Sequence, residues 1–446
     1  MKTLTNKERL GYGIGDLAIC FYWSGVGLYL LYFYTDIVGI SPFLAGWIYA
    51  IGIAWDAITD PFMGYLAERT ISKKGRYRPY IYYGAIPLAF SFVLLFWVPP
   101  FSGISLFLTL IIINIFHRTC FTVVSVPYSS LTPRITSDSE ERTKLTTARM
   151  IAASFGTLLM SSLGFPIINY FGGNNEAVGI LYLSAIAGLI AIFVLYITYY
   201  SVEDSSTAEK KESFAEVKNL LNSIFYNYPF WIVLFSVLMI FSTTVMFNNN
   251  LIYYIKYALD LHQYQGLILG ISAFTTFISI PFWAFISLKI GKKNTWQVSM
   301  SLLFFAFMSF YYFEISSLRE LIFIVCFIGL ASGSGGVLFW SMVPDTIEYG
   351  EWKSGFRSES SLYGFMTLIQ KSSIAVAILV LGILLTYINF EPNQKQSEET
   401  LVALKNIMAL IPSAGIALSI FLMYFYPITS GYHKNLLKII EERNNG

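Results

Sequence analysis

The sequence has few charged residues and few cysteines and histidines. Charged side chains make up 13% of its 446 residues, whereas a soluble domain carries about 25%. The three cysteines and three histidines do not form a disulfide or metal-binding pattern. The motifs HExxH, GxSxG and GxxxxGK[ST] are also absent from the sequence, which argues against a zinc protease, a serine hydrolase and an ATP-driven pump. We therefore expect neither an enzyme nor a cofactor-dependent protein, and no nucleic-acid partner.

Apolar runs recur along the whole chain, which is 55% hydrophobic. Each run is close to the ~20 residues that a helix needs to cross a bilayer. We predict an all-α membrane protein with twelve transmembrane helices. The predicted spans are residues 13–36, 43–66, 79–99, 104–131, 146–170, 177–200, 229–255, 264–288, 295–314, 319–343, 362–389 and 401–427.

A polar segment divides the predicted spans into six and six. We expect an N-terminal bundle over residues 1–200, a middle loop over 201–228 and a C-terminal bundle over 229–446. This layout is typical of two-bundle secondary transporters, although hydropathy alone also allows a channel or a membrane enzyme. Lys and Arg gather in alternate loops, such as residues 69–78. The positive-inside rule then predicts a multi-pass protein of the bacterial cytoplasmic membrane with both termini in the cytoplasm.

Two aspartates lie four residues apart inside the second predicted span, at Asp56 and Asp60. This spacing places both on one helix face. A carboxylate in hydrocarbon costs roughly 2.5–3.5 kcal/mol on insertion scales, so we expect the pair to face inward. Two carboxylates on one face repel unless a proton, a metal cation or a basic side chain lies between them. Pro61 follows directly and is expected to bend the helix.

Few basic residues lie within the apolar segments, and Lys371 is placed midway along the eleventh. A lysine at that depth needs a partner, and the aspartates of the first half are the obvious supply, although a snorkelling lysine is the simpler alternative. Arg118, Thr122 and Ser125 share one face of the fourth span. Arg118 there would either bind a sugar or an anion through its guanidinium fork, or pair with a membrane aspartate.

Two further positions are candidates for binding a solute. Asp16 follows two glycines in the first span, where it is either a site residue or a capping carboxylate. Trp340 precedes a polar segment at the end of the tenth span and is suited to stack on a sugar ring, although aromatic residues are also common as filler in membrane proteins.

Several longer segments carry a family resemblance. They are GYGIGDLA (11–18), LYFYTDIVG (31–39), WDAITDPFMGYLAERT (55–70), KKGRYRPY (73–80), VPYSSLTPRIT (126–136), RTKLTTARMIAAS (142–154) and VPDTIEYGEWKSGFRSE (343–359). With these segments, which span nearly the full chain, the sequence resembles the glycoside–pentoside–hexuronide:cation symporters of the major facilitator superfamily. The resemblance implies that superfamily's fold, with two six-helix bundles.

The resemblance also implies roles for individual residues. Asp56 and Asp60 correspond to the cation-site carboxylates, which would be metal ligands if the ion is Na⁺, with Thr122 and Thr59 as further oxygen ligands. Asp16 and Arg149 match positions that hydrogen-bond the sugar. Lys371 matches a lysine beside both sites, and the 345–357 segment resembles a cytoplasmic gate.

Three departures from a galactoside-transporting member of the family affect the expected substrate and ion. Thr59 stands where that member has Asn, so a proton becomes an alternative to Na⁺. Ser125 replaces an acid that binds neutral galactosides, and Arg118 replaces a small residue. A carboxylate is lost and a guanidinium gained, which favours an anionic or uronic sugar.

We therefore expect a monomeric carrier that couples Na⁺ or H⁺ flow to symport of a glycoside or hexuronide by alternating access. The cation would neutralise Asp56 and Asp60 and relax their hold on Lys371, while Asp16, Arg149, Arg118, Ser125 and Trp340 contact the sugar. A symporter of lysophospholipids or other amphiphiles on the same scaffold is the alternative.

Overall fold

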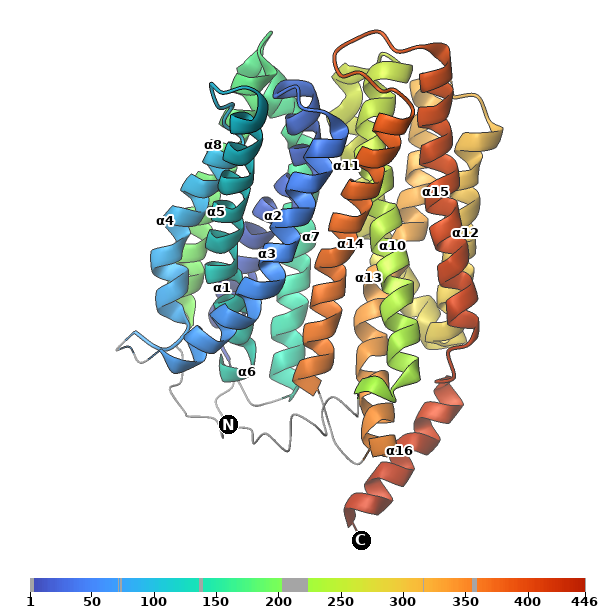
Figure 1. The fold of residues 1–446 in the computed structure, drawn as a ribbon. Helices are drawn as coiled ribbons and strands as arrows, with labels where there is room; N and C mark the ends of the chain where they lie inside the picture. The colour runs from blue at the N-terminus through green and yellow to red at the C-terminus, as the bar shows by residue number, and fades with distance from the viewer. Residues whose placement is uncertain are drawn as a thin grey trace. The chain divides into compact units, whose positions relative to one another are not determined.

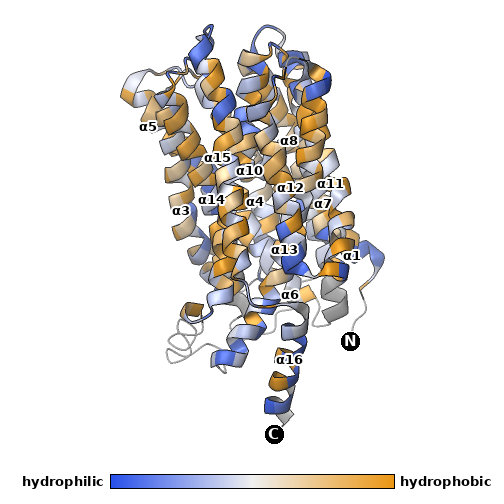
Figure 2. Cartoon of the chain, turned by 90° about the vertical axis from the view of Figure 1, so that its right-hand side faces the viewer, coloured by the Kyte–Doolittle hydropathy of each residue, from blue (hydrophilic) through white to orange (hydrophobic). Residues whose placement is uncertain are grey.

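A computed structural model describes residues 4–70, 72, 74–135, 139–202, 224–315, 317–354 and 359–445. These residues form helices and connecting segments, with no strand among them. A helix satisfies its backbone hydrogen bonds within one segment, as a chain in hydrocarbon requires. Figure 2 shows long helices that are mainly hydrophobic, with hydrophilic residues in the connecting segments and on the last helix. Most of the predicted middle loop, 201–228, lies outside the described residues.

The first half of the chain forms eight α-helices and one π-helical segment within the described residues (Figure 1). They are α1 (Asn6–Gly13), α2 (Gly15–Tyr32), η1 (Phe33–Ile37), α3 (Pro42–Arg69), α4 (Arg78–Leu95), α5 (Gly103–Ser130), α6 (Thr132–Ile135), α7 (Ser139–Gly172) and α8 (Glu176–Ser201). α3 begins with Ser41 as N-cap and proline in the first turn, the usual chemistry of a helix start. It continues through Pro61 to Arg69.

The second half repeats this pattern of long helices. They are α10 (Tyr228–Tyr253), η2 (Tyr254–Ala258), η3 (His262–Tyr264), α11 (Gln265–Ile290), α12 (Lys292–Tyr312), α13 (Leu318–Ser354), α14 (Glu359–Tyr387), α15 (Glu398–Tyr424) and α16 (Ser430–Asn445). The predicted tenth span ended at residue 343, whereas α13 runs on through Pro344 to Ser354. A proline removes only one donor from a helix, and neighbouring groups can satisfy what is freed. Residues 345–354 of the predicted gate segment are therefore helical, and residues 355–357 lie outside the described residues.

Each of the twelve predicted spans coincides with helix in the structure. Within the described residues, ten helical stretches are long and apolar enough to cross a membrane. The two predicted spans outside this set correspond to α4 and α12. The all-helical membrane architecture expected from the sequence is confirmed.

The chain folds into two compact units. Unit 1 comprises Met1–Ala208, Gln263–Gly270 and Ile378–Gln394, and unit 2 comprises Glu209–His262, Ile271–Ala377 and Lys395–Gly446. In unit 1, α3 packs against α5 and α2 against α7; in unit 2, α12 packs against α13 and α15. The predicted division into bundles at residues 201–228 stays a prediction.

The first and seventh spans end in the same way, which points to an internal repeat. Each closes in a π-helical turn, Phe33–Ile37 and Tyr254–Ala258. In the first turn, Val38 N donates to Phe33 O and Ile40 N to Tyr34 O. In the second turn, Leu259 N donates to Tyr254 O and Leu261 N to Ile255 O. A residue with positive φ follows each turn, Gly39 at 81° and Asp260 at 52°. Glycine and aspartate both tolerate this left-handed conformation.

Candidate functional site

The interface between α3 and α5 contains a buried ion pair. Arg118 Nη1 donates to Asp56 Oδ2 at 2.8 Å, and the two side chains are 6% and 1% exposed. The carboxylate thus has a fixed basic partner from a neighbouring helix of the same unit. Of the two roles that the sequence left open for Arg118, the structure contains the pairing with a membrane aspartate.

The residues around Arg118 make room for its guanidinium. One helical turn before Asp56, a Cβ at Gly52 would lie 2.3 Å from Asn114 Oδ1 and 3.3 Å from Arg118 Nε. A larger residue at position 52 would therefore require the Asn114 side chain to move. The Tyr49 ring lies beneath the guanidinium, with its centroid 5.1 Å from Cζ, within cation–π range. Arg118 Nη2 and Asn114 Oδ1 are buried and form no hydrogen bond with the part of the chain that the structure describes.

The second carboxylate of the pair lies one turn further along α3. Thr122 Oγ1 donates to Asp60 Oδ1 at 2.7 Å, with Thr122 buried and Asp60 half-buried. The neighbouring Thr59 donates its hydroxyl to Trp55 O at 3.1 Å, within its own helix. The structure therefore brings three of the four predicted cation-site residues, and Arg118, to one helix–helix interface.

A second ion pair joins α2 to α7. Arg149 Nε contacts Asp16 Oδ2 at 2.5 Å, and Arg149 Nη1 donates to Thr132 Oγ1 at 3.0 Å. Tyr128 donates to Asp16 at 3.1 Å, and the rings of Tyr128 and Tyr12 lie 4.9 and 5.7 Å from Arg149 Cζ. The two predicted sugar ligands are thus neighbours, and two tyrosine rings that contact each other lie beside Arg149.

The remaining predicted substrate residues are Ser125, Lys371 and Trp340. Ser125 is half-buried on α5, on the face that carries Arg118 and Thr122. Lys371 is buried in α14 and Trp340 is half-buried in α13, both in unit 2. The expected approach of Lys371 to the aspartates of the first half stays a prediction.

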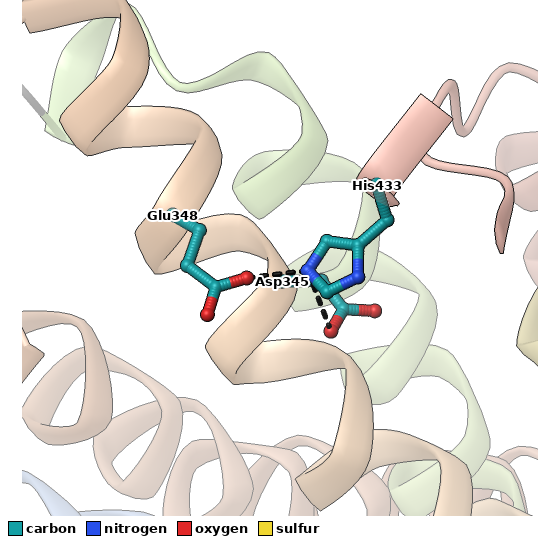
Figure 3. A group of neighbouring side chains, drawn as sticks. All are labelled: Asp345, Glu348 and His433. Carbon is teal, nitrogen blue, oxygen red and sulfur yellow. Dashed lines mark hydrogen bonds and ion pairs between the residues drawn. The ribbon is translucent and has the colours of Figure 1, made fainter. Parts of the chain in front are cut away.

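Unit 2 holds a charged cluster that sequence analysis did not find as a site (Figure 3). Lys292 Nζ, at the start of α12, lies 2.7 Å from both carboxylate oxygens of Asp345 on α13. His433 Nε2, on α16, contacts Glu348 and lies 3.7 Å from Asp345 Oδ1. The three-residue spacing of Asp345 and Glu348 on one helix was the available signal, but it did not identify His433 as their partner.

Asp345, Glu348 and His433 each bring one ligand-type atom within 4.8 Å of the others. The Lys292 ammonium already bridges both oxygens of Asp345, so a cation is present there as a side chain. Nearby, burial raises the pKa of Tyr426 well above its usual range, and the charge of Asp345 adds to the effect. Burial also raises the pKa of Tyr432, with Tyr228 contributing.

Comparison with known proteins identifies the family. The family model described as "MFS/sugar transport protein" matches residues 11–430. The chain belongs to this family of sugar transport proteins. The predicted membership of the cation symporters of the major facilitator superfamily is confirmed, and the chain is a transporter rather than an enzyme.

Curated relatives match nearly the whole chain. A putative 2,3-dihydroxypropane-1-sulfonate exporter of Escherichia coli is 30% identical over 450 residues, covering 98% of this chain and 96% of that protein. A putative glycoside/cation symporter of the same species, YagG, is 28% identical over 441 residues, covering 96% and 93%. Among solved structures, the inward-open xylose transporter XylE of E. coli has a TM-score of 0.66 at 14% identity, covering 97% of this chain and 98% of that one. This last likeness supports the fold alone.

Proposed function

We propose that this transporter couples the flow of Na⁺ or H⁺ to symport of a sugar or sugar acid, and that the coupling ion binds at Asp60. The observation that carries the proposal is the difference between two carboxylates one turn apart on α3. Asp56 is paired with the guanidinium of Arg118, whereas Asp60 accepts a hydrogen bond from the hydroxyl of Thr122. A small cation can bind the oxygens of the Asp60 carboxylate and the Thr122 hydroxyl without displacing Arg118.

The chemistry of the pair suits either ion. Hard cations prefer carboxylate, hydroxyl and carbonyl oxygens, and Asp60 and Thr122 supply the first two. A proton would neutralise Asp60 directly. In both cases the bound ion removes a net negative charge from a membrane helix, and such a charge is costly in hydrocarbon. Thr59 donates its hydroxyl hydrogen to Trp55 O within α3. Its oxygen can still serve as a further ligand of the ion.

The proposed substrate site uses Asp16 and Arg149. Together they offer acceptors and donors to sugar hydroxyls. Arg118 is paired with Asp56 and Arg149 with Asp16, so the preference for an anionic sugar is proposed from the sequence and from the names of relatives. The names of two relatives, a glycoside/cation symporter and a sulfonate exporter, support substrates that are polyhydroxylated or anionic.

The direct test is transport by the purified protein in proteoliposomes with an imposed Na⁺ or H⁺ gradient. A panel of neutral glycosides, a hexuronide and a lysophospholipid would identify the substrate class. We expect Asp60→Asn to abolish accumulation against a gradient while exchange of substrate across the membrane continues. Asp260→Asn is the matched control, because its side chain is 95% exposed and Asn tolerates the same positive φ.

Retained accumulation in Asp60→Asn would remove Asp60 as the coupling site. Accumulation of the lysophospholipid without any sugar transport would support the alternative substrate class.

The proposed location is the bacterial cytoplasmic membrane with both termini in the cytoplasm, supported by the distribution of Lys and Arg between loops. Single cysteines placed in the 69–78 segment and in the 173–175 turn, each in a variant without the three native cysteines, would test the orientation. Labelling of the 69–78 cysteine by an impermeant maleimide in intact cells would contradict it.

A further inference from the structure

The buried ion pair at Asp56 has a consequence for coupling that extends the proposed function and rests on it. We propose that Arg118 is a built-in counter-ion. It permanently occupies the position beside Asp56 that an exchangeable cation would otherwise take. Asp60 is then the carboxylate of the pair that exchanges an ion during transport, and Asp56 serves to hold Arg118.

The geometry of the pair supports a lasting contact. The N–O distance is 2.8 Å and both side chains are almost fully buried. Arginine keeps its charge in proteins, because the pKa of a guanidinium lies far above the physiological range. An ion pair enclosed in this way is costly to open, since both charges would be left without a partner in a low-dielectric environment. A mobile cation at Asp56 would have to replace Arg118 each cycle.

The surroundings of Arg118 form a prepared site for a guanidinium. Gly52 leaves the space that Asn114 and Arg118 fill, since a Cβ there would lie 2.3 Å from Asn114 Oδ1. The Tyr49 ring faces the guanidinium from the same helix as Asp56. Three positions along consecutive turns of α3, at residues 49, 52 and 56, thus match one side chain of α5. The three residues together accommodate the Arg118 side chain, which supports a lasting contact.

The Arg118 guanidinium also has donor capacity beyond the ion pair. Nη2 is buried and has no hydrogen-bond partner in the described ranges of the chain. It can donate to a buried water while Nη1 stays on Asp56.

The charge count follows from these contacts. Asp56, Asp60 and Arg118 carry a net charge of −1 when no ion is bound, instead of −2 for the two carboxylates alone. A single monovalent cation at Asp60 makes this group neutral. Reciprocal coupling between ion and solute then requires only one exchangeable charge on α3.

The test compares neutralising variants singly and together in proteoliposomes. Asp56→Asn and Arg118→Gln each leave one buried charge without its partner, and we expect each to lower substrate accumulation by about tenfold or more. The double variant Asp56→Asn/Arg118→Gln removes both charges at once. We expect it to recover accumulation to within about threefold of the parent protein, with the same ion dependence, because the two sites act as one unit.

The outcomes separate the two proposals. If Asp60→Asn keeps ion-driven accumulation, the proposed coupling site is wrong. If Asp60→Asn is uncoupled and a folded double variant is as uncoupled as Asp56→Asn, the coupling site stands and the role of Arg118 as counter-ion is overturned. Folding of each variant is measured by size-exclusion chromatography and thermal denaturation.

A second measurement uses the unaltered protein, in case a variant does not fold. Dicyclohexylcarbodiimide modifies protonated carboxyl groups in apolar environments, and mass spectrometry locates the adduct. We expect no adduct at Asp56 with or without the coupling ion, since its carboxylate is enclosed and held by the Arg118 guanidinium. An adduct at Asp56 that the coupling ion suppresses would overturn the proposal.

Discussion

The α3–α5 ion pair of unit 1 and the α12–α13–α16 cluster of unit 2 hold charges in different ways. In the first, arginine meets aspartate with both side chains at most 6% exposed. In the second, Lys292 is 34% exposed, and its partner Asp345 and the nearby Glu348 also contact a histidine. Burial makes the first pair costly to separate, because water cannot solvate the two charges once they are apart. Solvent access makes the second cluster adjustable, since water and salt can replace its contacts.

The largest effect on stability is expected from breaking the pair at Asp56. Arg118→Met leaves a buried carboxylate without its partner and should lower the free energy of unfolding by about 3–5 kcal/mol. Thermal denaturation of the purified protein in detergent measures this change. Adding Asp56→Asn should recover most of the loss. An unchanged melting temperature in the single variant would show that Asp56 finds another counter-ion.

The Asp16–Arg149 pair provides an intermediate case. Its side chains are 10% and 16% exposed, and Arg149 keeps Thr132 and two tyrosine rings as neighbours when the carboxylate is removed. We expect Asp16→Asn to lower the free energy of unfolding by about 2 kcal/mol. The same denaturation assay, with Asp260→Asn as control, checks the ranking. If Asp16→Asn lowers the free energy of unfolding more than Arg118→Met does, the expected ranking of the two ion pairs is wrong.

A smaller effect is expected at Lys292. Its side chain is 34% exposed, so Lys292→Met should cost only about 1 kcal/mol, with the loss shrinking as salt is added. Melting temperatures at low and high ionic strength measure both features. A loss independent of salt would place Lys292 with the buried pairs.

The smallest effect is expected at the C-terminal helix. His433→Gln removes the contact from α16 to Glu348 and Asp345 while keeping a polar side chain. Global stability should change by less than about 1 kcal/mol. The local effect should be visible as faster amide hydrogen exchange in residues 430–445. Unchanged exchange there would mean that apolar residues such as Leu436 and Ile440, which are buried, hold α16 without the histidine.

Sequence analysis located every long helix but not every helix end. The length of each apolar run was sufficient to locate the spans, because a membrane helix satisfies its backbone hydrogen bonds within its own segment. The extension of α13 past Pro344 was missed, since the polar residues that follow resemble a loop when their partners are unknown. Among them, Asp345 is held by Lys292 and Thr346 O accepts a hydrogen bond from Asn227. Neither partner belongs to α13, because Lys292 begins α12 and Asn227 is the N-cap of α10.

The candidate site was predicted residue by residue, but its pairing was not. The four-residue spacing of Asp56 and Asp60 placed them on one face, and helical geometry alone determines this. Which of them meets Arg118 and which meets Thr122 depends on how α3 and α5 are rotated and shifted against each other.

The sequence by itself determined the membrane helices, the inward aspartates and the family. The tertiary structure decided that Asp56 has an arginine as its partner, that Asp16 and Arg149 meet, and that His433 reaches Glu348. The physical reason is the range of the interactions. Backbone hydrogen bonds join residues four apart and follow local composition, whereas these charge contacts join residues 62, 133 and 85 positions apart and exist only after the helices have packed.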